Sequence, residues 1–132
     1  MNLKIITQEK VIFDGEVDEI YAKGTDGEFG ILKNHIPMMS ALDIGVTRIK
    51  IGDTYKAFTT MGGILQFKDD ECTILTTLAE SGDEIDEMRA RESLERGRRL
   101  LREANARIDS KKVSASIARA KARLKAKLNE GN

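Results

Sequence analysis

The spacing of the apolar residues changes once along the chain, within residues 80–90, and this change limits the folds open to it. Before it, apolar residues alternate with polar ones or form short runs that glycine and aspartate interrupt, a pattern typical of β-strands. After it, apolar residues recur every three or four positions among arginine, lysine, glutamate and alanine, which is typical of amphipathic helices. The sequence therefore predicts a β-rich part followed by a helical part.

The β-rich part contains many short apolar segments separated by turn residues. Eight of the 11 glycines precede residue 80, as turns between many short strands require. This spacing favours an antiparallel sandwich or a flattened barrel around one apolar interior. Asp14 and Gly15 are predicted to form one of the turns. The predicted strands are residues 3–7, 11–13, 17–22, 29–32, 38–42, 46–51, 55–60, 64–67 and 72–77.

The helical part contains two apolar stripes with a short break between them. Asp86 is a candidate N-cap for the first helix, and Asp109 or Ser110 for the second. A short connection between two such stripes predicts an antiparallel hairpin of two helices. The first stripe is Ala90, Leu94, Gly97, Leu101, Ala104 and Ile108, and the second is Val113, Ile117, Ala120 and Leu124, with Leu128 beyond it.

Alanine and glycine make up much of these stripes, so the seam between the helices buries little apolar area. At about 0.8 kcal/mol per buried CH₂, such a seam stabilises a hairpin far less than leucines would. We therefore expect amide hydrogen exchange to be much faster in the helical part than in the sheet, and we treat the hairpin as able to open.

Charge is distributed unevenly between the two parts, although the 22 basic and 22 acidic residues cancel. Residues 1–86 hold 8 basic and 16 acidic residues, and so a net charge of −8. Residues 87–132 hold the other 14 basic and 6 acidic residues, and so a net charge of +8. Either the two parts meet different partners, or one part packs on the other.

The sequence offers no catalytic set. The single histidine, His35, has no serine, cysteine or aspartate partner in a triad-like arrangement, and no group of residues has metal-ligand spacing. Cys72 lies in an alternating apolar segment and is predicted to be a buried strand thiol. No apolar run approaches the roughly 20 residues of a membrane-spanning helix. We expect neither enzymatic activity nor a metal site in this chain.

Nine arginines follow residue 86, and their spacing places several of them on common helix edges. In a closed hairpin, Arg96 and Arg123 lie at similar distances from the bend. Several guanidinium groups beside a helix N-terminus could bind a polyphosphate, but a solvated basic face is the simpler interpretation. Nucleic acid or an acidic protein surface would also suit a basic hairpin. The acidic β-rich part argues against nucleic acid.

Three segments resemble the epsilon subunits of F-type ATP synthases, and the resemblance extends over the whole chain. Residues 27–37 are similar to the family pattern G-E-x-G-I-x-P-G-H-x-P and read GEFGILKNHIP. Residues 62–65 and 69–75 are similar to its G-G-x-L/I and D-N-x-x-x-x-L segments. Lys33 and Asn34 replace the usual Pro-Gly, and we expect Asn34 to preserve the turn because asparagine tolerates a left-handed backbone conformation.

The resemblance implies an α+β fold, in which an antiparallel β-sandwich of about ten strands precedes an antiparallel two-helix hairpin. Residues 1–82 would dock on the gamma subunit and the c-ring, and residues 83–132 would form a mobile regulatory hairpin. The turn Asp26, Gly27 and Glu28 would face the c-ring, and the segment around His35 would lie against gamma. Such a subunit is non-catalytic and is peripheral to the membrane, at the cytoplasmic face of a bacterial cell membrane.

The resemblance also implies regulation. In this family the hairpin can fold beside the sheet or extend toward the alpha and beta subunits of the catalytic head, where it inhibits ATP hydrolysis. Residues 85–90 resemble the bacillar nucleotide-binding motif I/L-D-x-x-R-A, so ATP would be a regulatory ligand that favours the folded hairpin, with no cofactor required. The arginines would contact the phosphates and the other residues the base, ribose or backbone. The implied nucleotide-binding residues are Glu80, Ile85, Asp86, Arg89, Ala90, Arg96, Arg119 and Arg123.

A free-standing basic hairpin module that binds nucleic acid or acidic proteins is the alternative that the sequence leaves open.

Overall fold

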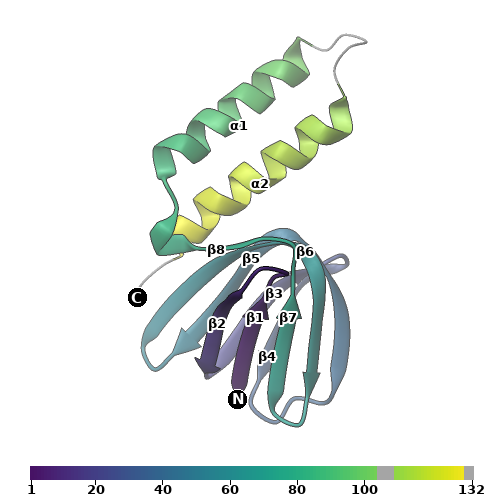
Figure 1. Cartoon of the computed structure of the whole chain (residues 1–132), viewed down its shortest axis with the longest axis vertical. Helices are drawn as coiled ribbons and strands as arrows, with labels where there is room; N and C mark the ends of the chain where they lie inside the picture. The colour runs from purple at the N-terminus through teal and green to yellow at the C-terminus, as the bar shows by residue number, and fades with distance from the viewer. Residues whose placement is uncertain (104–108, 130–132) are drawn as a thin grey trace.

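A computed structural model of the chain describes residues 1–103 and 109–129, in which eight strands precede two helices (Figure 1). The strands are β1 (Asn2–Ile6), β2 (Val11–Glu16), β3 (Glu19–Gly24), β4 (Gly27–Leu32), β5 (Met38–Ile51), β6 (Thr54–Lys68), β7 (Glu71–Leu75) and β8 (Ala79–Ser81). A 3-10 turn, η1 (Gly82–Glu84), leads to helices α1 (Glu87–Arg102) and α2 (Ser110–Leu128).

One sheet folds over itself to make both layers of the sandwich. Its strand order is β2-β1-β7-β6-β5-β3-β4, and β8 pairs with the first half of β6. The long strands β5 and β6 pass from one layer into the other and pair with each other in both. Their other neighbours are local: β8 pairs with the first half of β6, β7 with its second half, and β3 with β5 from residue 42 onward. Gly62 and Gly63, with φ angles of 80° and 121°, lie where β6 changes partners from β8 to β7.

The predicted sandwich is confirmed, with three corrections to its strands. The described residues form eight strands rather than about ten, because β5 and β6 continue through residues 43–45 and 61–63, where the sequence predicts breaks. The sandwich is also not purely antiparallel, since β1 and β7 pair in parallel. Asp14 and Gly15 are paired within β2 rather than forming a turn.

The interior of the sandwich is apolar and closely packed. Its two layers bury a cluster that includes Phe58, Phe67 and a set of fully buried aliphatic side chains: Leu3, Ile5, Ile20, Ile31, Ile49, Leu65 and Ile74. Cys72 is buried in the same cluster, as the sequence predicts, and burial raises the pKa of its thiol to about 12. Such a thiol is protonated at neutral pH and belongs to the core rather than to a site.

The two helices pack against each other along the predicted seam. Leu94, Ile117 and Ala120 are buried there, with Leu101, Val113 and Leu124 around them. A Cβ atom added at Gly97 would lie 2.6 Å from Ile117 Cγ1, so glycine permits this close approach. Both predicted N-caps form, since Asp86 accepts a hydrogen bond from the Arg89 amide and Asp109 from the Lys111 amide. Residues 104–108, which include the predicted Ala104 and Ile108, lie outside the described residues.

Helix α2 attaches the hairpin to the sandwich, and α1 lies on its far side (Figure 1). The apolar part of this attachment is small. Ala126 of α2 packs with Ala57 of β6, Val46 of β5 and Ile85 of the connection. The sequence stripe of α2 contains neither Ala122 nor Ala126, which are buried on a second face of the helix.

Candidate functional site

Residues 79–86 form the connection between the sandwich and the hairpin, and contacts hold this connection at both of its ends. Strand β8 pairs with β6, so that Glu80 lies opposite Thr59, and the Thr59 hydroxyl accepts a hydrogen bond from the Glu80 amide at 3.0 Å. Beyond η1, Ile85 is buried and the Asp86 carboxylate caps α1. These contacts fix the start of α1 beside the sheet edge and beside α2.

A cleft of about 420 Å³ opens at this junction, between the connection, the first turns of α1 and Arg123 in the C-terminal half of α2. Its volume lies in the range of small-ligand pockets, about 300–1,000 Å³. Three of its lining side chains are acidic and two are arginines. The lining residues are Glu80, Glu84, Ile85, Asp86, Arg89, Ala90, Ser93 and Arg123.

An ion pair crosses the cleft. The Arg123 Nε–H donates to the Glu80 carboxylate at 2.8 Å, and both side chains are about one-third exposed or less. The pair joins α2 to β8 and holds the guanidinium group at the cleft wall. A phosphate that enters the cleft would meet Arg123 already positioned, with Glu80 as the competing anion.

The structure brings together six of the eight side chains that the sequence assigns to a nucleotide: Glu80, Ile85, Asp86, Arg89, Ala90 and Arg123. Arg96 and Arg119 do not line the cleft. Arg96 is exposed two turns beyond Arg89 on α1, and Arg119 is half-buried one turn before Arg123 on α2. Both lie along the hairpin, beyond the cleft in the direction of the bend.

Two lining residues escaped the sequence prediction. Ser93 is four residues after Arg89 and three before Arg96, so the helical period places it on the same edge of α1. Glu84 belongs to the acidic run before α1, which the sequence links only to the helix dipole. The spacing alone could have identified Ser93, whereas the position of Glu84 depends on the path of η1.

The start of β4 contacts the hairpin. Thr25 and Asp26 form the exposed turn before it, and Gly27 and Glu28 are its first residues. The Glu28 carboxylate accepts a hydrogen bond from Lys125 Nζ of α2 at 3.0 Å. The hydrogen bond from Lys125 lowers the pKa of Glu28 below its ordinary value. The charge pair is exposed, and such pairs contribute about 0–1 kcal/mol to stability.

His35 follows β4 in the segment that the family pattern covers. Its ring packs edge-on against Phe67, with 5.9 Å between ring centroids, and its Nδ1 lies 2.7 Å from the Ile36 carbonyl oxygen. Asn34 has a φ of 69°, so the predicted left-handed turn is confirmed. The segment thus keeps an ordered turn although Pro-Gly is replaced.

A row of partly exposed apolar side chains crosses the outer face of the layer that contains β1, β2, β7 and the second half of β6. The strand register places Ala41 opposite Ile64, Ile64 opposite Leu75, Leu75 opposite Ile6, and Ile6 opposite Val11. Ile64, Leu75 and Val11 are each about half exposed. This apolar row lies on the layer away from Val46 and Ala57, where the hairpin packs.

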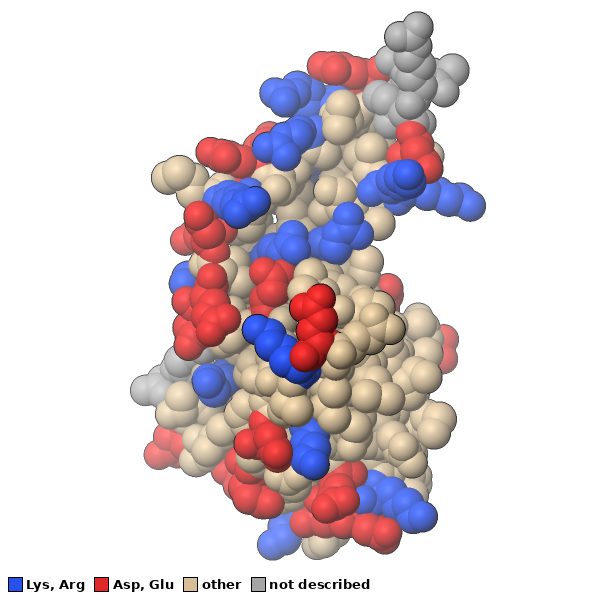
Figure 2. Space-filling view, in the orientation of Figure 1, with Lys and Arg blue, Asp and Glu red and all other residues tan. Residues whose placement is uncertain are grey.

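Charged side chains of both signs cover the visible face, with basic and acidic groups interspersed over the hairpin and at the foot of the sandwich (Figure 2). Among residues 1–103 and 109–129, no group of three or more histidine, cysteine or carboxylate side chains could hold a metal ion. No described helix is long and apolar enough to cross a membrane.

Comparisons with known proteins match nearly the whole length of the chain. Residues 1–82 match the family model of the β-sandwich domain of the ATP synthase delta/epsilon chain, and residues 83–127 match that of its long α-helix domain. The ATP synthase epsilon chain of Syntrophobacter fumaroxidans is 41% identical over 95% of this chain and 93% of its own length. The chloroplastic epsilon chain of Nicotiana tabacum is 33% identical over 96% and 95%.

Solved structures share the fold. A chain of the Euglena gracilis mitochondrial ATP synthase aligns with a TM-score of 0.82 at 22% identity, over 96% of this chain and 79% of that one.

Proposed function

The chain belongs to the epsilon-chain family of F-type ATP synthases, and we propose that it couples rotation of the c-ring to the catalytic head and restrains ATP hydrolysis through its hairpin. Subunits of this family are accessory rather than catalytic. The family membership, carried by the match along nearly the whole chain, supports a central-stalk subunit over the free-standing nucleic-acid module. The chain thereby belongs to a membrane-associated complex. We place it at the cytoplasmic face of a bacterial cell membrane.

The apolar row is our candidate for the surface that docks on gamma. It spans five strands of a rigid sheet, and it stays clear of the hairpin, so it can hold the stalk in either hairpin posture. We assign the exposed residues Asp26, Gly27 and Glu28 to the c-ring, and His35 to the border of the gamma contact. Patches of this kind on a soluble domain commonly mark interaction surfaces.

Replacing Ile64 by aspartate should therefore weaken the complex with gamma. Central interface residues contribute about 2 kcal/mol or more, so the Kd for gamma should rise about 30-fold or more. Ile51→Asp is the matched control, because Ile51 is a partly exposed isoleucine at the end of β5 and outside the row. Co-purification with gamma measures the binding of each variant, and a thermal melt checks that each variant is folded. Equal retention of gamma by both variants would refute the assignment of the apolar row.

The hairpin is our candidate for a two-state regulatory element. Within the part of the chain that the structure describes, its attachment to the sandwich and to η1 includes one small apolar cluster and polar contacts of Arg123, Lys125 and Lys127. Few buried contacts make opening accessible, and an opened hairpin would present its basic helices to acidic loops of the beta subunits. A packed small-residue seam and a weak attachment are what such an element requires.

We propose that ATP binds in the cleft and favours the folded hairpin. The cleft has a suitable volume, its walls come from β8, η1, α1 and α2, and it exists only while the hairpin is folded. Arg89 and Arg123 would hold phosphate groups, with Arg96 and Arg119 farther along the hairpin, and Glu80, Ile85, Asp86 and Ala90 would border the base and ribose. Any ligand that binds one posture alone stabilises that posture.

Replacing Arg123 by alanine should weaken ATP binding to the isolated chain by about 1.5–3 kcal/mol, the range of hydrogen bonds to charged groups. We expect a similar loss for Arg89→Ala, because Arg89 also lines the cleft. Arg98→Ala is the control, because Arg98 carries the same charge on α1, pairs with Glu95 and does not line the cleft. Calorimetry with ATP measures all three variants, and unchanged affinity in the Arg89 and Arg123 variants refutes the assignment.

A further inference from the structure

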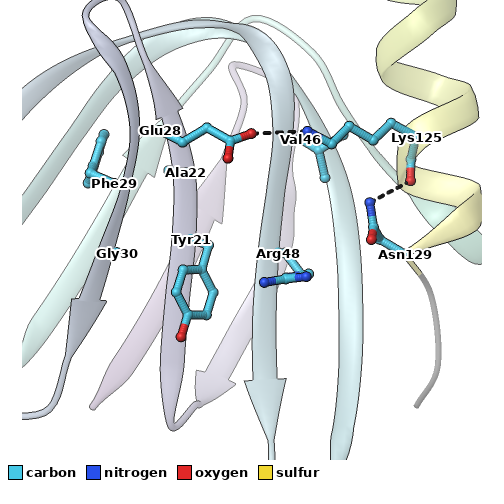
Figure 3. A pocket seen from close by; sticks show the side chains of 9 residues that line it. All are labelled: Tyr21, Ala22, Glu28, Phe29, Gly30, Val46, Arg48, Lys125 and Asn129. Carbon is cyan, nitrogen blue, oxygen red and sulfur yellow. Dashed lines mark hydrogen bonds and ion pairs between the residues drawn. The ribbon is translucent and has the colours of Figure 1, made fainter.

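A second cavity, of about 310 Å³, lies between the outer face of strands β3 to β5 and the last turn of α2 (Figure 3). Lys125 and Asn129 close it from the helix side, and Tyr21, Arg48 and Val46 line it from the sheet. It shares no lining residue with the cleft described above. Because its walls come from both the sheet and α2, this sheet–helix cavity exists only while the hairpin is folded.

Arg48 is oriented by the aromatic rings beside it. Its guanidinium carbon lies 5.0 Å from the centroid of the Tyr21 ring and 4.9 Å from that of Tyr55, on the two strands that flank β5. Stacking against ring faces holds the guanidinium plane while its N–H groups stay free to bond at the edge. Within residues 1–103 and 109–129, no carboxylate pairs with Arg48.

The cavity carries a positive charge in excess. Its lining contains two cations, Arg48 and Lys125, and one carboxylate, Glu28. Glu28 bonds to Lys125 at 3.0 Å, so the Arg48 charge has no direct partner there. Figure 3 shows these groups around the opening, with the Asn129 carboxamide donating to the Lys125 carbonyl at 2.9 Å.

We propose that this cavity binds a small oxyanion, inorganic phosphate being the simplest, between Arg48 of the sheet and Lys125 of α2. Arginine edges and lysine ammonium groups are the side chains that bind such anions most strongly. The anion would bridge the sandwich and the last turn of α2, and so would hold the hairpin folded. Anion binding at this site does not require ATP, so the proposal can be refuted without refuting the nucleotide cleft.

Amide hydrogen exchange of residues 117–128 in the full chain, without nucleotide, provides the test. Sodium phosphate is titrated against sodium chloride at constant ionic strength. Exchange should slow in a saturable way, by about tenfold when phosphate reaches about ten times its Kd. Arg48→Gln should abolish the slowing, and Arg48→Lys should weaken it. Lys50→Gln should leave it intact, since Lys50 also lies beside Tyr55 but outside the cavity.

An Arg123→Gln variant distinguishes the two sites, because Arg123 lines only the nucleotide cleft. Retained slowing in Arg123→Gln supports the sheet–helix cavity. Slowing that is lost in Arg123→Gln but kept in Arg48→Gln would place phosphate in the cleft and overturn the proposal. Equal slowing in every variant would reveal a general salt effect, and no slowing would mean no binding; either result also overturns it.

Discussion

Replacing Gly97 by valine should open the hairpin and weaken ATP binding. A Cβ at this position would lie 2.6 Å from Ile117 Cγ1 and 3.3 Å from its Cδ1, so the helices must separate. Forcing extra atoms into a packed contact costs about 1–3 kcal/mol, which corresponds to about a 5- to 150-fold increase in the opened population. Because the proposed cleft needs both helices, the measured ATP affinity should fall with that population.

Two further variants separate this effect from a loss of helix. Valine has a higher helix propensity than glycine, so α1 itself should not weaken in the Gly97 variant. Glu92→Val, at an exposed position of α1, should change neither exchange nor ATP affinity appreciably. Adding Ile117→Ala to Gly97→Val should restore part of the closure, because it removes the atoms that the new Cβ meets. Unaltered hairpin exchange in Gly97→Val would contradict a closed seam at this glycine.

Replacing Gly63 by alanine should give the largest loss of stability in the sandwich. Its φ is 121°, a conformation that side chains rarely adopt, and an added Cβ would lie 2.0 Å from the Leu75 carbonyl oxygen and 2.9 Å from Thr76 Cα. Neither backbone atom can move without breaking the β6–β7 ladder. Backbone strain and an unrelieved contact together should lower the free energy of unfolding by about 3 kcal/mol or more.

Gly52→Ala is the matched control for Gly63→Ala. Gly52 also has a positive φ, of 60°, but an added Cβ there meets nothing within 4 Å. Its cost should be about 1–2 kcal/mol, that of the left-handed conformation alone. Urea unfolding followed by circular dichroism measures both variants. Equal losses of unfolding free energy in the two variants would show that the contact with the Leu75 carbonyl oxygen adds no cost of its own.

Local signals in the sequence predicted much of the architecture. The change from strand to helix spacing, the caps at Asp86 and Asp109, and the seam through Leu94 and Gly97 each depend on residues a few positions apart. Such features are set by backbone periodicity and by capping hydrogen bonds, which a sequence displays directly. The six side chains gathered in the cleft were assigned from the family resemblance rather than from periodicity, and Arg96 and Arg119, assigned in the same way, lie outside it.

Features that depend on long-range pairing were missed. The continuity of β6 was hidden because Gly62 and Gly63 look like a turn, whereas they carry β6 from one layer to the other. The parallel pairing of β1 with β7 joins residues about 70 positions apart, and no local pattern encodes it. The burial of Ala126 and the Glu28–Lys125 contact depend on where α2 lies on the sheet, which alanine and lysine do not specify.

We propose that ATP binds between the hairpin and the sandwich and holds the hairpin folded. Amide hydrogen exchange of the isolated chain, resolved by residue with and without ATP, tests it most directly. We expect α1 and α2 to exchange much faster than β5 and β6 without ATP, and to slow about 100-fold at an ATP concentration of about 100 times Kd, while the sheet changes little. Helices that exchange as slowly as the sheet, or that ignore saturating ATP, would contradict the account.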